Sequence, residues 1–333
     1  MQPPVPSADP RHRTVAAPAG RLHLVEQGTG PLVLLVHGFP ESWYSWRHQL
    51  PALAAAGYRA VALDVRGYGR SSKPSAPQEY RMRALVADNL ALVHALGEES
   101  AVVVGHDWGA NIAAASALLH PEVFRAVGLL SVPYAPPGGP RPSEVFTRLG
   151  GDEEFYVSYF QEPGRAEAEI EPDVRGWLAG IYAALSADTM PGPGEPDPHF
   201  VGPGGRMRDR FPEGRLPAWL GEADLDHYAG EFERTGMTGA LNRYRNMDRD
   251  WEELSGFNGS PLTQPSLFIG GARDASTTWM ADAIDAYPAT LPGLVASHVL
   301  DDCGHWLQQE RPEETNRLLV SWLAEVSRRA PQR

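Results

Sequence analysis

The chain has 333 residues, of which 42% are hydrophobic and 21% are charged, an ordinary composition for a globular protein with a large core. A formal net charge of −13, with no cluster of Lys and Arg, argues against a nucleic-acid partner, whose phosphates the chain would repel. No apolar run approaches the roughly 18 residues that a membrane span needs.

The N-terminal segment, residues 1–11, is rich in proline and lacks the basic-then-apolar pattern of a signal peptide. We expect a short disordered lead there. The single cysteine, Cys303, cannot form an internal disulfide, which suits a reducing compartment, and we expect it to be a packing residue. We therefore expect a cytoplasmic protein without a membrane partner, as a monomer or a homodimer.

Short apolar runs along the chain predict buried parallel strands, because strands covered on both faces carry continuous rather than alternating apolar residues. After an antiparallel opening pair expected within Arg13–Gln27, the runs are Leu32–Val36, Ala60–Leu63, Ala101–Val104, Ala126–Leu130, Leu267–Ile269 and, with a weaker pattern, Ser297–Leu300. Helical patterns lie between the strands, at Leu85–Ala95, Gly109–Leu119 and Glu313–Ala324. This alternation predicts the α/β class, with a mostly parallel central sheet that helices cover on both sides.

The alternation stops between residues 135 and 255, where helix formers and aromatic residues dominate and no buried strand is evident. Within this stretch, residues 190–205 are dense in Pro and Gly, which predicts a loop, either a lid or a passive linker. We therefore expect a core made from residues 1–134 and 256–333, with a mostly helical cap, residues 135–255, inserted between them.

The segment Val104–Ala110, with the sequence VGHDWGA, joins a predicted strand to a predicted helix in the setting of a nucleophile elbow. Gly105 and Gly109 supply the small residues that such a turn needs, and Asp107 takes the nucleophile position. A carboxylate there favours displacement at a saturated carbon, because the product is a stable alkyl ester rather than a strained anhydride. The alternative is that Asp107 only caps the following helix. We expect His106 to pack beside the site.

Two further residues follow in the chain order that this fold requires, nucleophile, then acid, then histidine. Asp274 comes just after the strand at Leu267–Ile269, and His305 just after the last predicted strand. His305 would activate the water that cleaves the ester, and Asp274 would fix the tautomer of His305 and stabilise its positive charge. Asp301 and Asp302 are alternative acids, although their closeness to His305 indicates turn residues.

The segment His37–Pro40 directly follows the strand at Leu32–Val36 and is the candidate for half of an oxyanion hole. The backbone N–H groups of Phe39 and Trp108 would bind the oxyanion that forms when water attacks the ester. Pro40 is a candidate for a cis peptide bond. The alternative is a simple turn between the strand and the next loop.

Six motifs between roughly Leu32 and Trp322 resemble those of the soluble epoxide hydrolases, in their bacterial one-domain form. They are HGFPESWYSW from His37, DVRGYGRSS from Asp64, GHDWG from Gly105, YFQEP from Tyr159, LNRYRN from Leu241 and DCGHW from Asp302. The resemblance implies an α/β-hydrolase fold and an enzyme that opens an epoxide to a vicinal diol with water, through a hydroxyalkyl ester on Asp107. We expect no cofactor or metal, since the sequence has neither a phosphate loop nor metal-ligand spacing.

In that family two tyrosines of the cap hold the epoxide oxygen and donate a proton as the ring opens. The resemblance gives these roles to Tyr156 and Tyr244, with Tyr159 as an alternative to Tyr156. A phenol suits the role, because it can donate a proton while it stays neutral at neutral pH.

Three other functions compete with this one. A haloalkane dehalogenase shares the elbow aspartate and the tryptophan after it, but a halide leaves without a proton, and such enzymes often carry Asn at the position of Phe39. A non-catalytic binding protein on the same fold would not need Asp107, Asp274 and His305 together. An esterase or lactonase would carry serine at the elbow. The physiological epoxide and the preferred enantiomer are open.

Overall fold

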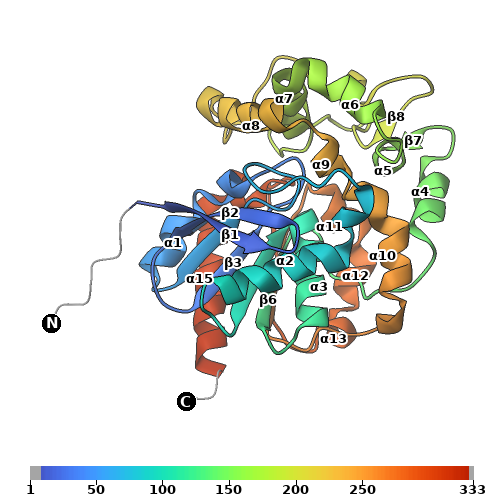
Figure 1. Ribbon diagram of the computed structural model, residues 1–333. Coiled ribbons are helices and arrows are strands. Elements are labelled where there is room, and N and C mark those ends of the chain that lie inside the picture. Colours follow the sequence, from blue (N-terminus) through green and yellow to red (C-terminus); the bar gives the residue numbers. More distant parts are fainter. Residues whose placement is uncertain (1–8, 330–333) are drawn as a thin grey trace.

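The computed structural model describes residues 9–329, and Figure 1 shows a central sheet flanked by helices, with a further group of helices beyond one edge of it. Most of the lead that was expected to be disordered, residues 1–8, lies outside the described residues. The expectation of disorder was wrong for Arg11, the last residue of that lead. Arg11 begins strand β1 (Arg11–Ala17) and pairs with Glu26 of the next strand.

Eight strands form one sheet in the order β1-β2-β4-β3-β5-β6-β9-β10. After β1 they are β2 (Gly20–Gln27), β3 (Leu32–Val36), β4 (Arg59–Leu63), β5 (Ala101–His106), β6 (Phe124–Leu130), β9 (Ser266–Gly271) and β10 (Leu294–Leu300). The β1–β2 and β2–β4 pairs are antiparallel, and the remaining pairs are parallel. The predicted mostly parallel sheet and its antiparallel opening pair are therefore confirmed.

Helices cover both faces of the sheet, because the apolar side chains of each strand alternate between two hydrophobic clusters. In β3, Leu34 belongs to the cluster that contains α2 (Met82–Ala95) and α3 (Trp108–Leu119). Leu35 belongs to the other, with α1 (Gln49–Ala55) and α15 (Pro312–Arg329). The three predicted helices lie within α2, α3 and α15. The shorter helices outside residues 135–255 are η1 (Trp43–Trp46), η2 (Pro77–Tyr80), α11 (Ala275–Trp279), α12 (Ala281–Asp285), α13 (Tyr287–Thr290) and α14 (Leu307–Glu310).

Residues 135–255, here called the insertion, connect β6 to β9 and are mostly helical (Figure 1). Their helices are α4 (Pro142–Gly150), α5 (Tyr156–Tyr159), α6 (Arg165–Ile170), η3 (Glu171–Asp173), α7 (Val174–Ala184), η4 (Met207–Arg210), α8 (Glu222–Thr235), α9 (Thr238–Leu241), η5 (Tyr244–Asn246) and α10 (Met247–Glu253), with η6 (Ser255–Phe257) at the end. The loop predicted over 190–205 is interrupted by strand β8 (Phe200–Val201), which pairs with β7 (Glu154–Phe155). The residues around β8 are rich in proline and glycine, but β8 itself contains neither. Its two residues are too few to show the sequence pattern of a strand. The division into a core and a cap stays a prediction.

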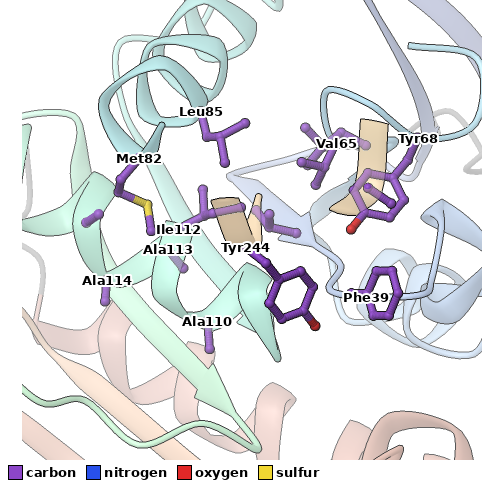
Figure 2. Close-up of a cluster of buried hydrophobic side chains, with 14 of the residues drawn as sticks. Phe39, Val65, Tyr68, Met82, Leu85, Ala110, Ile112, Ala113, Ala114 and Tyr244 are labelled. Atoms are coloured by element: carbon purple, nitrogen blue, oxygen red, sulfur yellow. The ribbon is translucent and has the colours of Figure 1, made fainter. Parts of the chain in front are cut away.

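The insertion shares one hydrophobic cluster with the sheet and its helices. Figure 2 shows Tyr244 of the insertion beside Phe39, with Ile112 of α3 and Leu85 of α2 in the same cluster. This contact brings insertion side chains to the loops that follow β3 and β5. In the described part of the chain, no helix is long and apolar enough to cross a lipid bilayer.

Candidate active site

Asp107 lies in the tight turn between β5 and α3, where the sequence predicts a nucleophile elbow. Its φ of 54° is left-handed, a strained conformation for a residue with a side chain. A Cβ on Gly105 would lie 1.9 Å from the carbonyl oxygen of Gly109, so a larger residue cannot fit this turn. Asp107 occupies the N-cap position of α3, but its side chain makes no capping hydrogen bond, which argues against the capping alternative.

The Asp107 carboxylate contacts backbone N–H donors and also faces a histidine. The N–H of Phe39 donates to Oδ1 at 2.8 Å, and the backbone N–H of Trp108 also donates to the carboxylate. The other oxygen, Oδ2, lies 3.6 Å from Nε2 of His305. The structure therefore brings both predicted oxyanion-hole donors to Asp107. As expected, the Phe39–Pro40 peptide bond is cis.

The imidazole of His305 is held on its other side by Asp274 and by a serine that sequence reasoning missed. Nδ1 lies 3.2 Å from Oδ1 of Asp274 and 3.1 Å from Oγ of Ser131, and the Ser131 hydroxyl donates to Oδ2 of Asp274 at 2.6 Å. Asp274 is buried, whereas the alternative acids Asp301 and Asp302 are exposed. The geometry therefore favours Asp274 as the partner of His305.

Ser131 ends the β6 region with a left-handed φ of 72° and a fully buried side chain. The three residues Ser131, Asp274 and His305 thus form a closed set of contacts behind the imidazole. The only sequence signal for Ser131 was its position at the carboxyl end of a predicted parallel strand, where α/β sheets place functional groups.

Burial, which lowers the pKa of His305, is outweighed by the negative charges of Asp274 and Asp107, and the net effect raises that pKa to about 9. At neutral pH the imidazole is therefore protonated. Burial raises the pKa of Asp107 itself, against the opposing charges of His305 and His106.

We predict that Asp107→Ser lowers the pKa of His305 below about 9, because it removes one of the two negative charges beside the ring. The imidazole would then lose its proton at a lower pH than in the parent protein. A pH titration of the imidazole followed by NMR measures this change, with Asp301→Asn as the matched control. An unchanged His305 pKa in Asp107→Ser would contradict the electrostatic coupling.

Tyr156 and Tyr244 line the same cavity as Asp107 and His305, with their ring centroids 6.1 Å apart. Burial and the charge of Asp107 raise the pKa of both phenols, so both stay protonated at neutral pH. The hydroxyl of Tyr159 instead donates to Glu169 at 2.5 Å, and Tyr159 does not line this cavity. The geometry therefore favours Tyr156 over Tyr159 as the second phenol.

The rest of the cavity wall is mostly apolar and comes largely from the insertion. Besides the residues already named, it consists of Pro40, Phe160, Ile181, Leu185, His199, Met207, Ser276 and Trp279. His199 belongs to the Pro/Gly-rich stretch, and its ring packs edge-to-face on Trp279, which is 48% exposed and so lies where the cavity meets solvent. The Pro/Gly-rich stretch thus borders the cavity.

His106 packs beside the site, as expected, and Cys303 is a buried packing residue, also as expected. Nδ1 of His106 lies 2.8 Å from Glu41, and Nε2 lies 2.7 Å from the carbonyl oxygen of His305. These contacts fix the backbone that carries His305. Cys303 is buried in the cluster on the α1–α15 face of the sheet.

Comparisons with known proteins agree with this geometry. Residues 31–190 match the model of the α/β-hydrolase fold family. Over 94% of its length the chain is 45% identical to Epoxide hydrolase B of Mycobacterium tuberculosis, of which it covers 98%. Among solved structures, an epoxide hydrolase from an endophytic Streptomyces is 71% identical with a TM-score of 0.95, and the match covers 97% of each chain. Epoxide Hydrolase A from Mycobacterium thermoresistibile is 44% identical with a TM-score of 0.88, over 95% of this chain and 98% of that one.

Proposed function

This chain belongs to the epoxide hydrolase family, and we propose that it opens an epoxide to a vicinal diol through a hydroxyalkyl ester on Asp107. One observation carries the assignment of residues to steps. The Asp107 carboxylate, backed by two N–H donors, shares a cavity with two protonated phenols and with an imidazole at 3.6 Å. A nucleophile, two acids and a base thus meet in one cavity with an apolar wall.

In the first step Oδ2 of Asp107 attacks a carbon of the epoxide, and the ring C–O bond breaks. An alkoxide is a poor leaving group, so the ring oxygen takes a proton from Tyr156 or Tyr244 as the bond breaks. Both phenols are kept neutral by burial and by the charge of Asp107, which makes them proton donors across the neutral pH range. The product is a neutral ester on Asp107.

In the second step His305 removes a proton from water, which attacks the carbonyl carbon of the Asp107 ester. Ester formation removes the charge of Asp107 and, with it, one of the charges that raise the pKa of His305. The pKa of the imidazole therefore falls after the ester has formed, which favours the neutral form that can act as a base. The N–H groups of Phe39 and Trp108 stabilise the oxyanion, and the diol leaves as the carboxylate is restored.

Ser131→Ala is expected to slow ester hydrolysis by about 10- to 100-fold and to leave ester formation unchanged. The variant loses a donor to Asp274 and an acceptor for Nδ1–H of His305, and hydrogen bonds to charged groups contribute about 1.5–3 kcal/mol. Rapid acid quench and mass spectrometry separate the two steps. Ser131→Gly accepts the left-handed φ but also lacks the hydroxyl, so it should share the defect; a normal rate in Ser131→Gly would show that only the backbone matters.

A haloalkane dehalogenase is less well supported, because a halide needs no proton from the two phenols that face Asp107. In a non-catalytic binding protein, the contacts that join Asp107, His305 and Asp274 would have no function. We further propose a cytoplasmic location, because the single cysteine is buried and forms no disulfide.

A single turnover in ¹⁸O-labelled water tests the ester mechanism. With enzyme in excess over an aryl epoxide such as styrene oxide, the diol should carry no label, and the ¹⁸O should appear in the peptide that contains Asp107. This follows because water attacks the ester carbonyl carbon rather than the epoxide. Label in the diol from the first turnover would mean that water attacks the epoxide directly, and no diol at all would count against epoxide hydrolysis.

A further inference from the structure

Arg243 is a buried cation for which the reaction described above has no use. Its side chain is 4% exposed, it forms an ion pair with Asp250, and its Nη1 donates to the carbonyl oxygen of Tyr80 at 2.6 Å. Within residues 9–329 its Nε finds no hydrogen-bond partner. A buried guanidinium normally satisfies its donors, so the position of this group needs another explanation.

The guanidinium lies instead over the face of Trp108, with Cζ 4.6 Å from the ring centroid. A cation at this distance is attracted to the electron-rich face of the indole. Trp108 follows the nucleophile Asp107, and its backbone N–H already serves that residue. Its side chain, held by Arg243, is therefore fixed beside the reacting groups.

The indole of Trp108 in turn contacts Tyr244. Their ring centroids are 5.2 Å apart at an interplanar angle of 85°. Burial raises the pKa of the Tyr244 phenol, and the Trp108 side chain partly opposes this as a hydrogen-bond donor to it. Because the phenol oxygen accepts this hydrogen bond, the hydroxyl proton of Tyr244 points in another direction. Tyr244 lines the cavity. A continuous set of contacts thus runs from a guanidinium through an indole to a phenol.

We propose that Trp108 and Arg243 are positioning residues for the proton donor Tyr244, an inference that rests on the proposed function. As the epoxide C–O bond breaks, its electron pair takes the Tyr244 proton, and negative charge develops on the phenol oxygen. The indole N–H stabilises that charge, and Arg243 both orients the indole and strengthens its N–H as a donor. Ester hydrolysis later releases a proton, which His305 first takes from water, and that proton returns to the phenol.

A double-mutant cycle on ester formation tests this proposal, with every variant made in a His305→Gln protein so that the ester accumulates. The rate of ester formation with styrene oxide is measured by acid quench and intact-protein mass spectrometry. Trp108→Phe keeps the ring and the backbone N–H but lacks the indole donor. We expect it to slow ester formation about tenfold when Tyr244 is present and less than about twofold in Tyr244→Phe, where Tyr156 is the remaining acid.

Arg243→Gln should slow ester formation several-fold when Trp108 is present and have no further effect in Trp108→Phe. If the loss of the ion pair with Asp250 unfolds this variant, Arg243→Lys keeps a cation there without the planar group and should give a smaller loss of the same kind. Equal slowing by Trp108→Phe with and without Tyr244, or no slowing in either, would overturn the proposal. Absence of ester in the His305→Gln parent would instead contradict the proposed function itself.

Discussion

Replacing Tyr156 and Tyr244 together by phenylalanine is expected to reduce ester formation on Asp107 by about a thousandfold or more. Each phenol is a possible source of the proton that the ring oxygen requires, and a positioned general acid contributes about 10²- to 10⁴-fold. The cavity wall offers no other phenol, since Tyr159 is directed at Glu169. Either single variant should keep measurable activity, because one acid remains.

The measurement for these tyrosine variants is the rate of ester formation in a single turnover, with Tyr159→Phe as the matched control. That control removes a phenol from the same helix, α5, without touching the cavity, so its rate should be close to that of the parent protein. Normal turnover in the double variant would refute the assignment of the proton donors.

Asp274→Asn is expected to slow ester hydrolysis by about 10³- to 10⁴-fold while the ester still forms. The carboxylate raises the pKa of His305 and accepts from Nδ1, which leaves Nε2 to face Asp107. An asparagine can present an N–H to the ring instead of an acceptor, and this stabilises the wrong tautomer of the base. The ester should therefore accumulate during turnover.

Accumulation in Asp274→Asn is measured by intact-protein mass spectrometry during steady-state turnover. Asp301→Asn and Asp302→Asn are the controls, because these exposed residues are close to His305 in sequence and were the alternative acids. If Asp302→Asn accumulated ester and Asp274→Asn did not, the acid would have to be reassigned.

Much of the fold could be predicted because a buried parallel strand has a recognisable local sequence pattern. The run Leu32–Val36 is apolar at every position because helices cover both faces of β3, and its bounds were predicted correctly. Strand β8 has no such pattern, since two residues are too few to show a periodic arrangement of apolar side chains. Arg11 was assigned to the lead because polar residues on an edge strand resemble those of a loop.

The proposed groups Asp107, Asp274 and His305 could be located from the sequence, because each stands in a short motif after a strand. Asp107 and Asp274 follow β5 and β9, and the parallel order of the sheet brings these two strand ends to one edge. Ser131 also follows a strand, but a single serine at this place in the sequence does not indicate a catalytic role. Its contact with Asp274 and its left-handed φ depend on tertiary structure.

The insertion was the least predictable part of the site. Its loop reaches the cavity through contacts between residues that are far apart in the sequence. His199 and Trp279 are 80 positions apart in numbering, and only the folded chain packs their rings edge-to-face. Arg243 belongs to a motif that pointed to Tyr244, but nothing in sequence placed it over Trp108. His199 and Trp279 line the cavity, so we expect them to influence which epoxide it accepts.

The most direct test of the account is intact-protein mass spectrometry on His305→Gln, incubated separately with styrene oxide and with a bromoalkane. Without its base the enzyme should stall after the first step, with an adduct that carries the whole mass of the epoxide and maps to Asp107. No adduct from the epoxide would contradict the account. An adduct only from the bromoalkane, with bromide lost, would make the protein a dehalogenase.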